Sequence, residues 1–174
     1  RTKLLLLCSP HNPVGRVFSR SELENLAQIC LERDIALCSD EIHCGLVLDE
    51  SQRHIPVASL DQEIAAKTIT LMAPSKTYNL PGLGFSFAVI ENRELRKRFL
   101  QVMDGIVPHV NQLGLVAAAA AYCASEYWRQ ELLGYLRRNR DLVADWAVSA
   151  GVPMPPLQAT YLAWLDFRAL ALEE

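Results

Sequence analysis

Short apolar runs alternate with amphipathic segments over the first part of the chain. Lys3–Cys8 is almost wholly apolar, a pattern typical of a parallel strand that is covered on both faces. Ser19-Arg20-Ser21-Glu22 then has the spacing of a capping box, and the apolar residues after it recur at helical intervals, which predicts a helix to about Arg33. Ile35–Cys38 is the next predicted strand. Strand, helix and strand in succession indicate a βαβ unit, which brings the ends of both strands to one edge of a sheet.

The alternation continues and then gives way to longer helical patterns. The segment from Gly151 to Pro156 is rich in turn-forming residues and ends the last of these helices. The remaining predicted elements are, in chain order, a short helix over Asp61–Lys67, strands over Thr68–Met72 and Phe85–Ile90, helices over Arg93–Met103, Asn111–Ala124 and Glu126–Ala150, and a strand over Tyr161–Leu165. This order predicts an α/β fold with a mainly parallel sheet and helices on both faces.

Composition and charge narrow the classes of partner. The chain has 17 basic and 20 acidic residues and a formal net charge of -3, so it lacks the broad positive field that favours nucleic-acid binding. Its apolar runs fall short of the ~20 residues that span a bilayer, and no membrane association is expected. The five cysteines form no C-x-x-C pair, which favours reduced thiols in the cytoplasm. The chain begins at Arg1 without an initiator methionine, so we expect it to be a piece of a longer protein.

Polar residues that could take part in binding or catalysis follow three of the predicted strands, at the edge where open α/β sheets bind ligands. Lys76 is either a solvated surface charge or an amine that acts as a Schiff-base nucleophile and proton carrier. Asp40 is either a turn or ion-pair residue or a buried anion that keeps a ring nitrogen protonated. Asn12 is either a turn residue or an amide donor for a phenolic oxygen. The remaining candidates, His11, His54 and His109, stand alone and receive no role, and no metal site is expected.

Taken together, three motifs resemble a known family. Ser9-Pro10-His11-Asn12-Pro13, Ser39-Asp40-Glu41-Ile42-His43 and Ala73-Pro74-Ser75-Lys76-Thr77-Tyr78-Asn79 resemble, in order and in spacing, the central motifs of the pyridoxal-phosphate enzymes of the aspartate aminotransferase superfamily. His43 stands where most aminotransferases of the superfamily carry a tyrosine. The chain is therefore similar to the MalY/PatB-type branch of C–S β-lyases, which cleave cystathionine and related cysteine thioethers.

The resemblance implies a role for each residue of the site. Lys76 would bond to the aldehyde of pyridoxal 5'-phosphate and later take the proton from the substrate α-carbon. Asp40 would keep the ring nitrogen protonated, and Asn12 would hydrogen-bond the phenolic oxygen with His43 nearby. Ser75 lies in the region that contacts the phosphate, or is a turn hydroxyl that satisfies its own backbone.

The resemblance also implies an activity and a domain organisation. It implies a β-lyase that forms a thiol, pyruvate and ammonia from an amino-acid substrate and works as a homodimer. Residues 1–150 would be a partial cofactor-binding large domain with its following long helix, and residues 151–174 a linker and the start of a small α+β domain. Such a piece would be inactive alone. Gly84 stands where many aminotransferases carry a phosphate-binding arginine, which counts against the alternative of an ordinary aminotransferase. A non-catalytic α/β module is the second alternative.

Overall fold

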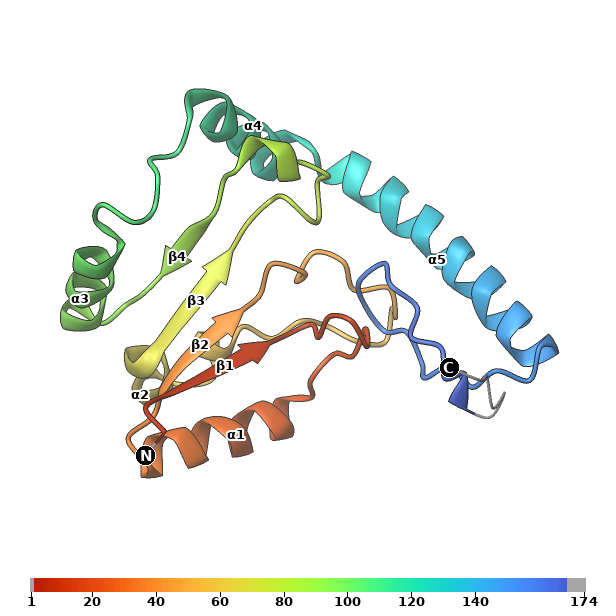
Figure 1. Ribbon diagram of the computed structural model, residues 1–174, viewed down its shortest axis with the longest axis horizontal. Helices are drawn as coiled ribbons and strands as arrows, with labels where there is room; N and C mark the ends of the chain where they lie inside the picture. The colour runs from red at the N-terminus through yellow and green to blue at the C-terminus, as the bar shows by residue number, and fades with distance from the viewer. Residues whose placement is uncertain (1, 169–174) are drawn as a thin grey trace.

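A four-stranded sheet forms the centre of the protein, which was examined as a computed structural model that describes residues 2–168. Its strands follow one another across the sheet in chain order, with the first three parallel and the fourth antiparallel (Figure 1). They are β1 (Leu4–Cys8), β2 (Ala36–Asp40), β3 (Thr68–Met72) and β4 (Phe87–Val89). The predicted, mainly parallel α/β sheet is confirmed.

The first four helices begin where a side-chain cap satisfies one or two of their first backbone N–H groups, whereas the fifth has no side-chain cap. The capping box is confirmed, because the Ser19 hydroxyl accepts from the Glu22 backbone and the Glu22 carboxylate accepts from the Ser19 backbone. Asp61, Asn92 and Asn111 cap the next three helices, each by a side-chain oxygen that accepts from a backbone N–H of the first turn. The helices are α1 (Arg20–Glu32), α2 (Gln62–Lys67), α3 (Arg93–Met103), α4 (Gln112–Ala124) and α5 (Glu126–Ser149), with short 3-10 turns at η1 (Val57–Ser59) and η2 (Pro81–Leu83).

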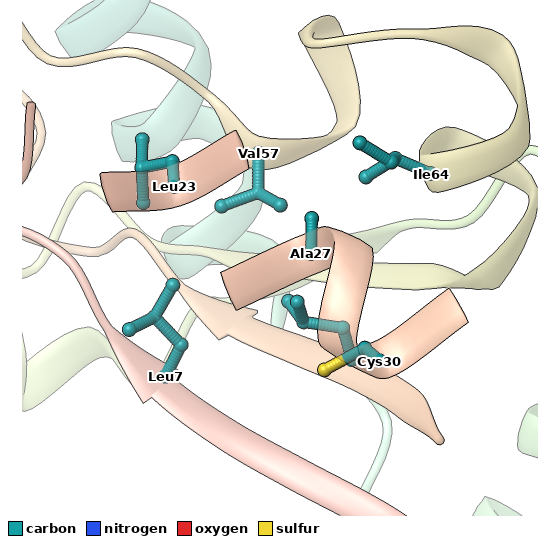
Figure 2. Close-up of a cluster of buried hydrophobic side chains, with 7 residues drawn as sticks. Leu7, Leu23, Ala27, Cys30, Val57 and Ile64 are labelled. Atoms are coloured by element: carbon teal, nitrogen blue, oxygen red, sulfur yellow. The ribbon is translucent and has the colours of Figure 1, made fainter. Parts of the chain in front are cut away.

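Helices cover both faces of the sheet, because successive residues of a strand point to opposite sides. On one face, Leu37 of β2 packs with residues from β1, α1, η1 and α2, which Figure 2 shows as a single apolar cluster. The members of this cluster are Leu7, Leu23, Ala27, Cys30, Leu37, Val57 and Ile64. On the other face, Cys38 packs with Ile69 and Ile90, against Leu95 and Phe99 of α3.

The second face is open beside β1. Leu6, which pairs with Cys38 across the sheet, has 72% of its surface exposed, and Leu4 on the same side is also exposed. Helix α4 is apolar around most of its circumference, yet Leu113 and Val116 are exposed. None of the helices in residues 2–168 is both long and apolar enough to cross a membrane.

The C-terminal segment returns to the sheet edge from the far end of α5 (Figure 1). Leu157 packs with Leu133 of α5 and with Leu46 and Leu48 of the loop after β2. The predicted strand over Tyr161–Leu165 is wrong: the structure has only an isolated antiparallel bridge there, between Ala159 and Val47. The apolar pattern is present, but within the described residues no strand lies beside 161–165 to complete a ladder.

Candidate active site

The loops that leave β1, β2 and β3 begin at one edge of the sheet. The register places Cys8 beside Asp40, and Asp40 beside Leu71, at the ends of the three parallel strands. The pairing continues one residue beyond the strands, because the Ser9 N–H donates to the Asp40 carbonyl at 3.0 Å and the Glu41 N–H donates to the Leu71 carbonyl at 3.0 Å. The structure therefore confirms that the three predicted strand ends meet.

Asp40 and Lys76 both come within electrostatic reach of His43 at this edge. The His43 side chain is only 3% exposed, and burial is the main reason that its pKa lies below the ordinary value. The positive charge of Lys76 lowers this pKa further, whereas the negative charge of Asp40 raises it. Asp40 is held at the start of its loop, where its Oδ1 accepts from the Ile42 N–H at 3.2 Å.

The ring nitrogens of the His43 imidazole are available to form hydrogen bonds with another group. Both of its ring nitrogens are buried and have no hydrogen-bond partner within the described residues. Buried polar atoms are nearly always paired, so an orphaned imidazole between a carboxylate and an amine indicates a site for a polar ligand. A ligand with an aldehyde, a phenolic oxygen and a ring nitrogen meets the donors and acceptors of this set, and the residues therefore fit pyridoxal phosphate.

The two other predicted cofactor contacts lie in the loops at the same edge. Asn12 is exposed and lies in a tight turn that is closed by a bridge between His11 and Arg16. Both X-Pro bonds of this loop, Ser9-Pro10 and Asn12-Pro13, are cis. Ser75 is half-buried and directly precedes Lys76. Their contacts with a cofactor stay predictions.

Gly45 allows the loops after β2 and β3 to pack tightly against each other. A Cβ at this position would lie 2.6 Å from Cγ2 of Thr77, the residue after Lys76. Arg129 of α5 also holds the loop after β2, since its Nη1 donates to the Gly45 carbonyl at 3.0 Å. A larger side chain at residue 45 would push apart the loops that carry His43 and Lys76.

A buried contact between Glu41 and His54 was not foreseen from the sequence. Glu41 is only 1% exposed, and its Oε2 lies 2.7 Å from Nε2 of His54. Its Oε1 accepts from the Ser39 hydroxyl at 2.8 Å and from the Val57 N–H at 3.1 Å. The expectation that His54 stands alone is wrong, because the chain folds the segment before η1 back onto the end of β2. In the sequence, the only sign of this contact was that a second carboxylate, Glu41, directly follows Asp40.

The structure is thus an open α/β sheet with a lysine, a carboxylate and a buried, unpaired imidazole at the carboxyl edge of its parallel strands, where such sheets bind ligands. The model of the family Aminotransferase class I and II matches residues 1–174. The chain therefore belongs to this family.

Three relatives illustrate the similarity. Cystathionine beta-lyase PatB of Bacillus subtilis (strain 168) is 38% identical over 175 residues, which cover 98% of this chain and 45% of PatB. The crystal structure of OvoB superposes with a TM-score of 0.95 at 47% identity, over 98% of this chain and 45% of that one. Cystalysin from Treponema denticola, whose crystal structure contains a pyridoxal 5'-phosphate cofactor, superposes with a TM-score of 0.94 at 38% identity, over 98% and 44%. The chain thus spans slightly less than half the length of these relatives.

Proposed function

We propose that the intact protein that contains this chain is a pyridoxal-phosphate-dependent C–S β-lyase. Its substrates would be cysteine thioethers of the cystathionine class, and one water would be consumed for each thiol, pyruvate and ammonium released. The observation that carries the proposal is the convergence of Asp40, Lys76 and the unpaired His43 imidazole at one sheet edge. The similarity to PatB and to cystalysin supports the cofactor and the type of reaction.

Each residue of the site has a proposed task. Lys76 would be the catalytic residue: its Nζ would hold the cofactor at the aldehyde carbon, with the aldehyde oxygen leaving as water, and would afterwards take the proton from the substrate α-carbon. Asp40 would hold the ring nitrogen and its proton by placing a negative charge beside it. Asn12 would donate to the phenolic oxygen, His43 would help to orient the ring near that oxygen, and Ser75 would donate to the phosphate.

When bound, pyridoxal phosphate supplies a ring that withdraws electrons from the substrate α-carbon. The protein's part is then to move one proton to and from Lys76 and to keep the reacting groups out of bulk water. Burial of His43, and the tight packing of Gly45 against Thr77, support such a closed environment.

An aminotransferase is the second candidate, because the family includes that activity by name. The two reactions differ in their need for a keto acid. A β-lyase forms pyruvate from cystathionine with no keto acid present, whereas an aminotransferase requires a keto-acid acceptor. Incubation of the intact protein with cystathionine, followed by pyruvate measurement, separates them: strict dependence on added keto acid would contradict the lyase.

Lys76→Ala tests the site itself. We expect this variant to lose the visible absorption band that the cofactor acquires when it bonds to a lysine amine. Lys67→Ala is the matched control, because Lys67 lies at the opposite end of β3, where it pairs with Asp34 on the surface. An unchanged band in Lys76→Ala would refute the assignment. No band in the unsubstituted protein would favour a non-catalytic α/β module.

We also propose a cellular location, an oligomeric state and a domain organisation for the intact protein. The five free cysteines support a reducing, cytoplasmic location. The exposed apolar surface of α4 supports assembly of the intact protein as a homodimer. Residues 1–150 are proposed as part of the cofactor-binding domain and residues 151–174 as the linker into a second, small domain.

A further inference from the structure

His43 has an aromatic neighbour that comes from the far end of the chain. The ring of Tyr161 meets the imidazole edge-on, with centroids 6.2 Å apart and an angle of 65° between the planes. Tyr161 is 45% exposed, whereas His43 is 3% exposed. The phenol ring therefore covers one side of a buried imidazole and itself reaches solvent. Nothing in the sequence pattern of residues 161–165 indicated this contact.

The backbone that presents Tyr161 is held in an unusual conformation. Thr160 is fully buried and has a φ of 71°, a left-handed value that a β-branched residue rarely adopts. It is retained by its surroundings: the Thr160 N–H donates to the Leu46 carbonyl at 2.9 Å, and the Ala159 N–H donates to the Gly15 carbonyl at 2.8 Å. Strain of this kind persists only where neighbouring structure enforces it, and it gathers at functional sites.

Packing is what fixes the orientation of the His43 ring. A buried imidazole is ordinarily held by hydrogen bonds from its nitrogens, but neither nitrogen of His43 has a partner among the described residues. The charged groups that face it are Asp40, from its own strand end, and Lys76, from the loop after β3. These charges give the ring no hydrogen bond, whereas the Tyr161 ring packs against it edge-on.

We propose that Tyr161 is a positioning residue of the site, whose ring fixes the orientation of the His43 imidazole. The inference rests on the proposed function, because the purpose of the contact is to hold His43 ready for the cofactor. The left-handed backbone at Thr160 aims the Tyr161 ring toward His43 instead of away from it. The phenol hydroxyl is not required for this task, so the ring alone carries the effect.

The test compares variants of Tyr161 in the intact protein. Tyr161→Phe keeps the ring and removes the hydroxyl, whereas Tyr161→Ala removes the cover. Tyr127→Ala is the control, since Tyr127 is a highly exposed tyrosine on α5. The first measurement is the pKa of His43, taken by NMR on imidazole-labelled protein stripped of cofactor. The second is the pH profile of the visible absorption band after pyridoxal phosphate is added.

Tyr161→Phe and Tyr127→Ala are expected to match the unsubstituted protein in both measurements. In Tyr161→Ala, water reaches the imidazole, so the pKa of His43 rises toward its ordinary value and the charged fraction at pH 6 increases. The pH profile of the absorption band then shifts in the same direction. An unchanged His43 pKa together with an unchanged pH profile in Tyr161→Ala would overturn the proposal.

The two readouts separate this inference from the proposed function. If the protein takes up no cofactor, the proposed function fails, while the pKa of His43 in the stripped protein still tests the contact. If the cofactor binds but Tyr161→Ala leaves both measurements unchanged, only the positioning role fails. Should Tyr161→Ala lose its fold by circular dichroism, Tyr161→Val carries the same expectation, because its side chain is also too small to cover the imidazole.

Discussion

Removal of the Glu41 carboxylate should destabilise the protein strongly. Glu41 is almost fully buried beneath the site and accepts hydrogen bonds from Ser39 and Val57 while pairing with His54. In Glu41→Ala, all three partners lose their acceptor, and an unsatisfied buried group costs about 1–3 kcal/mol. Because three partners lose this acceptor at once, the combined cost reaches about 3–5 kcal/mol. We expect a loss of about 3–5 kcal/mol in the free energy of unfolding, or a hundredfold to several thousandfold in the equilibrium constant.

Chemical denaturation of the intact protein measures this loss. Glu41→Gln is the matched variant: it keeps the size and one carbonyl oxygen, so we expect it to lose only about 1–2 kcal/mol. A double-mutant cycle with His54→Ala isolates the pair, and its coupling energy should be about 1–3 kcal/mol. A loss below about 1 kcal/mol in Glu41→Ala would refute the reasoning, because it would mean that water replaces the carboxylate at no net cost.

Three further predictions follow from the loops and caps. Gly15→Ala should lower the free energy of unfolding by at least about 2 kcal/mol in denaturation experiments, because φ is 74° there and a Cβ would lie 2.1 Å from Leu157; Gly151→Ala, with a similar φ but open space, should cost about 1 kcal/mol. The pKa of His43 is lowered from 6.5, so on acidification the unfolded chain takes up the proton before the folded protein does. The contribution of His43 to stability is therefore complete above about pH 6.5 and falls as the pH is lowered. A His43→Gln variant should show a flatter pH dependence of its denaturation midpoint. Ser19→Ala should cost about 0.5–2 kcal/mol and Ser19→Asn almost nothing, because asparagine also caps helices well and brings no charge beside Glu22; equal losses in the two variants would contradict a capping role.

Local signals explain which elements could be predicted. Thr68–Met72 and Arg93–Met103 were predicted with the bounds that the structure has, since a capped helix precedes the first and Asn92 caps the second. The strand-end rule likewise predicted that Asp40 and Lys76 would meet, because parallel pairing depends on the apolar runs themselves.

Tertiary contacts could not be predicted from local sequence patterns in the same way. The pairing of Glu41 with His54 joins the two ends of the loop between β2 and η1, which has no periodic pattern. The segment from Tyr161 has the apolar residues of a strand, but a strand also needs a neighbour, and the left-handed turn at Thr160 directs the ring toward His43 instead. Propensity alone predicts neither outcome.

A hydrogen bond between the loop after β1 and the C-terminal segment also determines the order in which parts of the site can fold during synthesis. The backbone N–H of Val17 donates to the side chain of Gln158, which lies 141 positions later in the sequence. At about 5–20 residues per second, roughly 7–28 s of translation separate the two partners. The βαβ core can form while the ribosome is still at work, but the Asn12 loop gains this anchor only afterwards. Assembly of the site is therefore a late, long-range step, and variants in residues 157–161 should slow the acquisition of cofactor binding more than the formation of helices.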